Sequence, residues 1–286
     1  MATDGPGRRD GPPPAPPPLP VPVPDSHTHL DIVGGDPAAA VAAAAAVGVD
    51  RVVQIGCDVA SSRWAAQLAG DNPAVLATVA LHPNEAPRLG TGLDEALRAV
   101  EALAREPRVR ALGETGLDTF RTPDPAGQAV QEHSFRAHVA MAKASGKALV
   151  VHDRDAHAAI LRVLDDEGAP ATVVMHCFSG DEEFARQCVR RGYLLSFSGT
   201  VTFASAAGLR AAAAVTPREQ LLVETDAPFL TPTPYRGRPN APYLIPVTVR
   251  ALAQITGTGL DELCETLSAN AERAFGPWWA GPVPVR

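Results

Sequence analysis

The chain of 286 residues is 45% hydrophobic and 20% charged, a composition that supports a full-sized core and excludes disorder as its main state. Its 25 Lys and Arg residues against 32 Asp and Glu residues give a formal net charge of −7, which argues against a broad basic surface that grips many phosphates of a duplex. That balance is compatible with a nucleic-acid enzyme whose positive charge comes locally from metal ions.

The start of the chain is rich in proline, because residues 1–24 hold ten of its 28 prolines. We predict that residues 1–24 form a disordered extension and that residues 25–286 form a single domain. The pair Arg8-Arg9 is followed by prolines rather than by an apolar stretch, so this start does not match a signal peptide. The 262 residues that follow it are close to the ~250 residues of an α/β barrel.

Eight short runs rich in Val, Ile and Leu recur along the rest of the chain, and their continuous apolarity is typical of parallel strands covered on both faces. The predicted strands are Pro22–His27, Arg51–Cys57, Val75–His82, Val109–Glu114, Leu149–His152, Thr172–His176, Tyr193–Phe197 and Leu221–Asp226. The predicted helices between them are Pro37–Val47, Ser61–Leu68, Leu93–Arg105, Gln128–Ser145, Asp155–Glu167, Glu182–Arg191 and Ala206–Ala214.

Helix signals support this alternation independently of apolar periodicity. Asp36-Pro37 and Ser61 are predicted helix starts, and Gly146 and Gly192 are predicted stops. After the eighth strand, a Pro-rich loop over residues 231–242 precedes two further predicted helices, Ile245–Thr256 and Asp261–Phe275. Eight strand–helix repeats favour an α/β fold of the closed (β/α)8 TIM-barrel type over an open doubly wound sheet.

Membrane spans and disulfide frameworks are not supported by the sequence. No stretch of about 18 uninterrupted apolar residues occurs. The four cysteines contain no CxxC pair, which argues against a zinc ribbon, a redox dithiol or a disulfide framework; they are Cys57, Cys177, Cys188 and Cys264. We therefore expect reduced thiols in a cytoplasmic protein.

Ionisable side chains stand at the ends of several predicted strands, where a buried strand should be apolar. In an α/β barrel the C-terminal strand ends line the active site, so these side chains should converge at one mouth. Such a group would be badly desolvated unless cations satisfied it. We predict a divalent-metal site formed by His27, His29, Glu114, His152, His176 and Asp226.

The spacing of these residues suggests two ions. His27 and His29 point the same way from an extended chain and can share one ion, whereas a carboxylate can bridge two. Glu114, which has glycines nearby on both sides, is the candidate bridge. We predict a dinuclear site with ions ~3.5–4 Å apart. One ion takes His27, His29, Glu114 and Asp226, and the other takes Glu114, His152 and His176.

The two carboxylates Glu114 and Asp226 are the predicted catalytic residues. Asp226 is placed to accept a proton from metal-activated water, although a helix-capping aspartate is the alternative interpretation. Glu224 lies two residues before Asp226, and we interpret it as a partner behind the ligands or as a residue of the barrel interior. The sequence does not decide whether the metal is Mg2+, Mn2+ or Zn2+.

The chain resembles the TatD-type metal-dependent deoxyribonucleases, a branch of the amidohydrolase-like barrels. The matching stretches occur in family order and are DSHTHLD (25–31), LHP (81–83), GETGLD (113–118), VH (151–152), HCFSG (176–180), ETDAPFL (224–230) and PYRGRPNAP (234–242). The resemblance implies two divalent ions in a (β/α)8 barrel and hydrolysis of DNA phosphodiesters from the 3′ end. Its metal-binding pattern falls on the same six residues.

Some positions depart from the family pattern. Residues Asp153-Arg154-Asp155 stand where the family often has Cys-Arg, and Ala204 stands where it often has Lys. Near the end of the last motif, Pro239-Asn240-Ala241-Pro242 replaces Arg-Asn-Glu-Pro. None of these positions is a predicted metal ligand, so the departures affect the expected contacts with the substrate rather than the expected metal site.

Three residues are candidates for binding the DNA substrate. His82 follows the third strand and can hydrogen-bond a phosphate, or it is a structural histidine. In the loop after the eighth strand, Arg236 can bind phosphate and Tyr235 can stack on an unpaired base, unless both are simply solvated. The remaining histidines and the tryptophans are interpreted as surface or packing residues, namely His133, His138, His157, Trp64, Trp278 and Trp279.

The favoured function is therefore a 3′–5′ exodeoxyribonuclease that makes a short contact with single-stranded ends and needs no stable protein partner. One alternative keeps the metal site but hydrolyses another ester or amide, such as a D-aminoacyl-tRNA or a small amide or lactone. A non-catalytic binding protein on a barrel scaffold is the other alternative.

Overall fold

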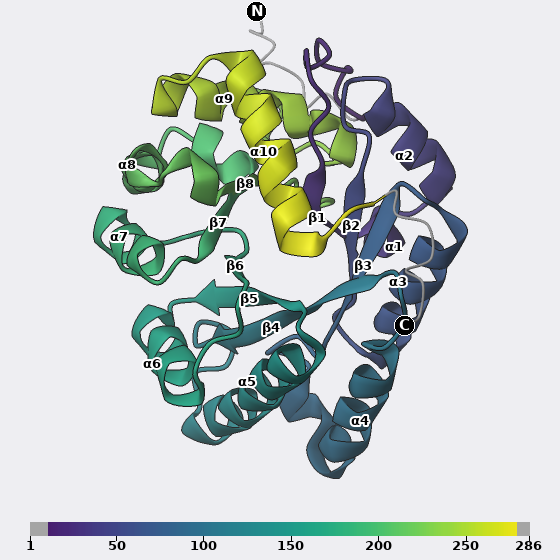
Figure 1. Ribbon diagram of the computed structural model, residues 1–286, viewed down its shortest axis with the longest axis vertical. Coiled ribbons are helices and arrows are strands. Elements are labelled where there is room, and N and C mark those ends of the chain that lie inside the picture. Colours follow the sequence, from purple (N-terminus) through teal and green to yellow (C-terminus); the bar gives the residue numbers. More distant parts are fainter. Residues whose placement is uncertain (1–10, 279–286) are drawn as a thin grey trace, which may run out of the picture.

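The computed structural model of the chain describes residues 11–278. Eight parallel strands are hydrogen-bonded in sequence order and helices surround them, which confirms the predicted TIM barrel (Figure 1). The strands are β1 (Asp25–Thr28), β2 (Val52–Ile55), β3 (Val75–Val79), β4 (Val109–Asp118), β5 (Ala148–Arg154), β6 (Val173–Met175), β7 (Leu194–Phe197) and β8 (Leu221–Val223).

The barrel closes between β1 and the chain that follows β8. The backbone N–H of Asp226 donates to the carbonyl of His27, and that of His29 donates to the carbonyl of Ala227, both at 2.9 Å. The Asp25 carboxylate adds hydrogen bonds to the backbone N–H and the hydroxyl of Thr225, at 2.9 and 2.5 Å. The closing contacts therefore run through the same short segments that carry predicted metal ligands.

The α-helices follow the predicted alternation, with an extra turn after β1. They are α1 (Leu30–Val33), α2 (Pro37–Ala45), α3 (Val59–Asp71), α4 (Leu93–Leu103), α5 (Pro125–Ser145), α6 (His157–Glu167), α7 (Glu182–Arg190), α8 (Ala207–Val215), α9 (Ile245–Thr256) and α10 (Leu260–Phe275). Short 3-10 helices are η1 (Ala86–Gly92), η2 (Gly199–Thr202), η3 (Arg218–Gln220) and η4 (Pro242–Leu244). Among residues 11–278, no helix is both long and apolar enough to cross a membrane.

Helix ends differ from the prediction where a capping residue lies further upstream. Helix α3 begins at Val59 rather than at Ser61, because Asp58 is the N-cap and Ser61 completes its capping box. The predicted start at Asp36-Pro37 is confirmed, since the Asp36 side chain accepts from the N–H of Ala38. Gly146 is also confirmed as a stop, in the left-handed conformation.

Strands β4 and β5 extend beyond their predicted ends at Glu114 and His152. They remain paired up to Asp118 and Arg154, with a register shift between Leu112 and Thr115. Glu114 lies inside this irregular stretch, so its side chain reaches the barrel mouth from within a strand rather than from a strand end.

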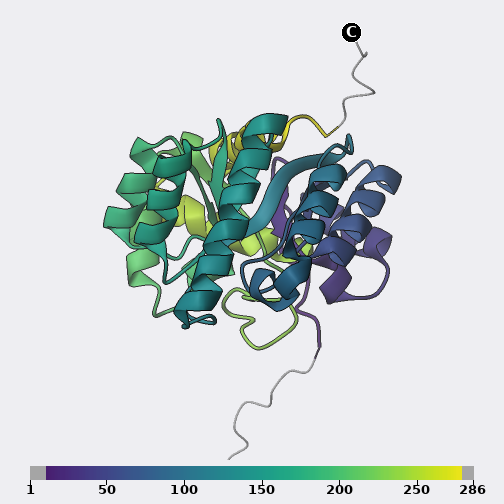
Figure 2. The ribbon, with the colours of Figure 1, turned by 90° about the horizontal axis from the view of Figure 1, so that it is seen from below.

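Helix α10 closes the end of the barrel away from the loop between β8 and α9 (Figure 2). Its residues Ala271 and Phe275 pack with Trp278 against inward-facing strand residues such as Ile55 and Leu76. Trp278 is 1% exposed and Trp64 is half-buried against the outer core, so both are packing residues as predicted. Trp279 lies outside the described residues.

The proline-rich segment over residues 11–24 differs from the disordered extension that we expected; residues 1–10 lie outside the described part. Proline removes backbone donors but keeps the carbonyl acceptors, and these accept from side chains of the barrel. Arg238 donates to Gly11 and Pro12, Tyr243 to Pro13, and Arg250 to Pro18; these four contacts involve side-chain donors from the chain after β8.

Apolar anchors fix the same segment. Leu19 is 7% exposed, and its backbone N–H donates to the carbonyl of Val47 at 3.0 Å. Val23 is fully buried and donates to the carbonyl of Gly48 at 2.9 Å. The chain therefore reaches β1 along a packed path beside α2.

Truncation of this anchor should destabilise the protein. We expect Leu19→Ala to lower the free energy of unfolding by about 2 kcal/mol, because a buried side chain is lost. Pro17→Ala, at an exposed position of the same segment, should change it by less than about 1 kcal/mol. Urea unfolding measures both, and an unchanged stability for Leu19→Ala would mean that the segment does not pack in solution.

A glycine in β4 should be essential for the close approach of β4 to β5. Gly116 has φ +145°, and a Cβ there would overlap the carbonyl oxygen of His152. We expect Gly116→Ala to cost about 3 kcal/mol or to prevent folding, because overlap and backbone strain add. Gly70→Ala on α3, where a Cβ meets open space, should instead stabilise by about 0.5–1 kcal/mol in the same thermal and urea measurements.

Candidate metal centre

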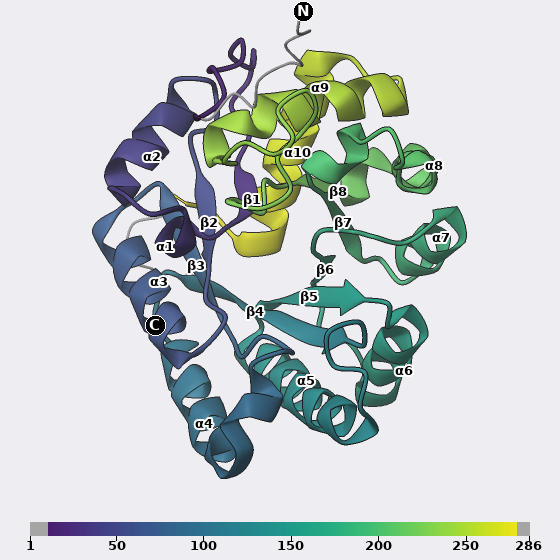
Figure 3. The same cartoon turned by 180° about the vertical axis from the view of Figure 1, so that it is seen from behind.

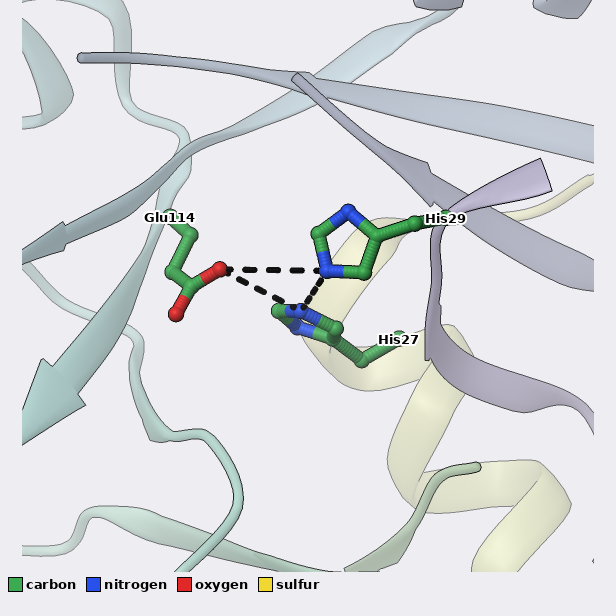
Figure 4. A group of neighbouring side chains, drawn as sticks. All are labelled: His27, His29 and Glu114. Carbon is green, nitrogen blue, oxygen red and sulfur yellow. Dashed lines mark hydrogen bonds and ion pairs between the residues drawn. The ribbon is translucent and has the colours of Figure 1, made fainter. Parts of the chain in front are cut away.

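His27, His29 and Glu114 converge at the mouth of the barrel from β1 and β4 (Figure 4). The Nε2 atoms of the two histidines are 3.3 Å apart. Glu114 Oε2 lies 3.6 Å from His27 Nε2 and 3.9 Å from His29 Nε2. The i, i+2 spacing on an extended chain thus brings both imidazoles to one point, as predicted.

The second oxygen of Glu114 faces a different set of imidazoles. Oε1 lies 2.5 Å from His152 Nδ1, 3.0 Å from His176 Nε2 and 3.4 Å from His82 Nε2. These histidines come from β5, from the chain after β6 and from the chain after β3. One buried carboxylate therefore joins two groups of nitrogen donors.

Asp226 lies beside the first group. Its Oδ1 is 3.4 Å from His29 Nε2 and 3.8 Å from His27 Nε2. Its backbone has φ +52°, a left-handed conformation that is uncommon outside glycine but that aspartate tolerates. Asp226 is not a helix cap in the structure, because no α-helix begins at the residues that follow it.

Carboxylates lie behind two of the histidine rings. Glu224 is fully buried, and its Oε1 accepts from His176 Nδ1 at 3.0 Å and from the N–H of Cys177 at 2.9 Å. This contact leaves His176 Nε2 directed at Glu114. On the other side, Asp118 Oδ2 lies 3.4 Å from His152 Nε2 and accepts from the Asn84 amide at 2.8 Å.

The charges of the cluster stabilise one another. Burial tends to raise the pKa of Glu114, but the charges of His176 and His82 and the hydrogen bond from His152 hold it well below its ordinary value. Burial likewise tends to lower the pKa of His176, but the carboxylates of Glu224 and Glu114 hold it well above its ordinary value. The Glu114 carboxylate is thus kept ionised in the barrel mouth.

The donor set fits divalent metal ions. Three groups of side-chain donors have all their donor atoms within 4.8 Å of one another; they are His27, His29 and Glu114; His27, His176 and Asp226; and His82, Glu114 and His152. Imidazole and carboxylate donors at these separations are the ligands that zinc and similar ions use.

A cavity of about 600 Å³ opens above the cluster and is lined by His29, His82, Glu114, His152, His176 and Asp226, among others. It is therefore the space in which a substrate reaches all the candidate ligands except His27, which is fully buried below them. The structure thus brings the six predicted ligands and His82 together.

The other two predicted substrate-binding residues do not line this cavity. The guanidinium of Arg236 lies 4.1 Å from the centroid of the Phe203 ring, and the Tyr235 ring is covered by Arg238 at 5.7 Å. Proline-flanked loop positions do not reveal from sequence which way their side chains turn, because the turn geometry sets it.

Sequence reasoning missed several residues at the mouth. Asp118, Arg121, Arg154 and Phe229 line the cavity, and so does Cys57, whose Sγ is 3.8 Å from Glu114 Oε2. Asp118 and Phe229 belong to the GETGLD and ETDAPFL motifs, so their place in those motifs was a usable signal. Cys57 follows β2 and Arg154 ends β5. Both therefore lie at strand ends, the position from which the metal ligands were predicted.

His138 illustrates a predicted packing residue that supports the site. It is fully buried on α5, where Nε2 accepts from the N–H of Leu81 at 3.1 Å and Nδ1 contacts the carbonyl of Ser134 at 2.8 Å. It therefore fixes the chain next to His82. The other two helix histidines are surface residues, since His133 is exposed and His157 pairs with Asp153.

A TIM barrel that presents histidines and carboxylates to one cavity at its strand ends defines the class of metal-dependent hydrolases. A family model described as TatD related DNase matches residues 24–276. The chain therefore belongs to the TatD-related DNase family and is a metal-dependent hydrolase.

Individual relatives agree with this family. The chain is 47% identical over 261 residues to an uncharacterized metal-dependent hydrolase TatD of Mycobacterium tuberculosis, covering 89% of this chain and 98% of that relative. It is 36% identical to a 3′-5′ ssDNA/RNA exonuclease TatD of Cronobacter turicensis, covering 82% and 90%. The crystal structure of the TatD homolog YjjV of Escherichia coli superposes with a TM-score of 0.81 at 27% identity, covering 89% and 98%.

Burial of His138 should make stability depend on pH. Burial lowers the pKa of His138 from 6.5 to about 4, so the folded protein keeps it neutral while the unfolded chain takes up a proton. The free energy of unfolding is therefore unaffected by this group above pH 6.5. As the pH falls from 6.5 to 4, protonation of His138 in the unfolded chain lowers the free energy of unfolding by about 3 kcal/mol. Urea unfolding of His138→Gln should show a decrease in the free energy of unfolding between pH 7 and pH 4 that is smaller by this amount. The exposed variant His133→Gln should show the same decrease as the unmodified protein.

Proposed function

We propose that this hydrolase is a 3′–5′ exonuclease that shortens single-stranded DNA ends with two divalent ions. The observation that carries the proposal is that the two oxygens of Glu114 face different histidines. Its Oε2 faces His27 and His29, and its Oε1 faces His152 and His176. A carboxylate placed in this way suits a bridge between two cations. The printed name of the Cronobacter relative, an ssDNA/RNA exonuclease, supports a nucleic-acid substrate.

The proposed ligands divide between the two ions as the contacts suggest. His27, His29, Asp226 and Glu114 Oε2 would hold one ion, and His152, His176 and Glu114 Oε1 the other. When bound, two such ions lower the pKa of water and neutralise charge that develops on the phosphoryl oxygens, as in other two-metal phosphodiesterases. Zn2+, Mn2+ and Mg2+ are the candidate metals.

The chain's own residues would bind and orient the strand. Arg121 and Arg154 line the cavity and can pair with phosphates outside the metal cluster. Glu224 holds the Nδ1 proton of His176, which keeps Nε2 directed at the cluster. Asp226, at the floor of the cavity, is placed to accept the proton of the attacking water.

The acidic surface and the cavity size favour a short contact with a strand end. A net charge of −7 argues against a broad basic face, and the Arg side chains that line the cavity are Arg121 and Arg154. We also propose that residues 25–286 are one hydrolase domain, in agreement with the span of the family match from 24 to 276. Cytoplasmic location stays a prediction from the cysteine pattern.

Removal of the bridge or of the metal should abolish activity. On 5′-labelled single-stranded DNA, the metal-reconstituted protein should give a ladder that shortens from the 3′ end. Glu114→Ala should lower kcat/KM at least about 100-fold, because it deletes a ligand of both ions. Chelator should stop the reaction, and Mn2+ or Zn2+ should restore it.

Glu101→Ala is the matched control, because this glutamate is exposed on α4 and pairs only with Arg105 among the described residues. It should leave the ladder unchanged. Charged tRNA in a parallel reaction tests the alternative ester substrate. Deacylation of that tRNA without shortening of DNA, or full DNA hydrolysis by Glu114→Ala, would contradict the proposal.

A further inference from the structure

The large hydrophobic side chains that are exposed among residues 11–278 gather around one opening. They are Ile32, Phe120 and Phe229, which are 52%, 61% and 50% exposed. Ile32 and Phe229 line the cavity of the metal centre, and Phe120 precedes the lining residue Arg121. Single exposed apolar residues are usual on a protein surface, but a set confined to the rim of one cavity indicates a binding surface.

The two phenylalanines follow strands on opposite sides of the barrel. Phe120 follows β4 and Phe229 follows β8, and these strands are half a turn apart in the ring of eight (Figure 3). Arg121, which follows Phe120, and Phe229 line the same cavity as Glu114 and the histidines. A chain segment that places a phosphate at the centre can therefore reach one ring on each side.

Local contacts hold both rings in place while leaving them accessible. The Arg154 guanidinium lies 4.2 Å from the centroid of the Phe120 ring, so this platform combines an aromatic face with a positive charge. The Phe229 ring packs edge-on against His29 at 6.2 Å between centroids, and its backbone N–H donates to the carbonyl of Asp226 at 2.9 Å. Each ring is thus tied to a residue that lines the cavity.

Exposed aromatic faces beside phosphate-binding groups suit nucleobases. Any of the four bases can stack on such a ring, but only when it is unpaired and free of its duplex neighbour. Arg154 at one platform complements the negative strand. This chemistry favours a single strand over a duplex and places no demand on sequence.

We propose that Phe120 with Arg154, and Phe229, are two stacking platforms that hold the unpaired bases on the two sides of the scissile phosphate. This inference rests on the proposed nuclease function and adds the substrate contacts to it. One platform holds the 3′-terminal base and the other holds the base before it. The pair explains how a small, acidic protein can bind a strand end through two nucleotides.

The test compares Phe120→Ala and Phe229→Ala with the unmodified holoenzyme on 5′-labelled single-stranded DNA. We expect KM for the first cleavage to rise roughly 5- to 100-fold in each, with kcat changed much less, because stacking is lost while the metal centre stays intact. Phe120→Trp and Phe229→Trp keep an aromatic ring at each position, so their KM should remain close to that of the unmodified protein. Glu101→Ala, which changes an exposed residue of α4 that does not line the cavity, should leave KM unchanged.

Substrates without a base locate each platform. An oligonucleotide with an abasic analogue at the 3′-terminal position, and another with it at the penultimate position, should each become insensitive to one of the two alanine substitutions. Metal content per chain and the melting temperature of each variant should equal those of the unmodified protein, which separates lost stacking from a disturbed site.

The outcomes keep the two proposals apart. If the unmodified holoenzyme does not shorten DNA, the proposed nuclease function fails before any variant is compared. If it does shorten DNA but both alanine variants keep its KM, the platforms are wrong. Equal losses on intact and abasic oligonucleotides, or a loss of bound metal in the variants, would also overturn them.

Discussion

Closure of the barrel between β1 and β8 is the constraint on which the metal centre depends. The bonds that close it join the backbone of His27 and His29 to that of Asp226 and Ala227, so the ligands from the two ends of the sheet also form its seam. Asp25 reinforces that seam through Thr225. The first and last strands are about 200 residues apart in sequence, and the site therefore exists only when the whole barrel has formed.

A buried carboxylate surrounded by imidazoles gives the centre its electrostatic character. Glu114 stays ionised in a nearly water-free position because histidines contact both of its oxygens. Behind them, Glu224 orients His176 and Asp118 lies close to His152. Unpaired buried charge is costly, so the carboxylates and histidines of this cluster need either one another or bound cations. Bound cations would reconcile the acidic net charge of the chain with the polyanionic substrate that we propose.

The closed barrel also positions the loops that form the rim of the cavity. Loops that leave the strand ends carry residues with no part in the fold. Here the loops after β4 and β8 carry the exposed rings of Phe120 and Phe229, and Arg154 at the end of β5 contacts the Phe120 ring. A rigid barrel holds these loops at fixed separations while their side chains stay open to solvent. The packed segment over residues 11–24 contacts the chain after β8 and adds support on one side of the mouth.

The sequence by itself determined the eight-fold alternation, the TIM barrel and the identity of six candidate ligands with His82, because apolar strands end in ionisable residues at regular places. It could not determine the longer β4 and β5, the cap at Asp58 or the packing of residues 11–24, which depend on partners distant in the chain. Nor could it place Arg236 and Tyr235, which do not line the cavity, because the turn geometry of their loop sets the direction of their side chains. Only the tertiary structure decided which oxygen of Glu114 faces which histidines, because that geometry arises where separate strands meet.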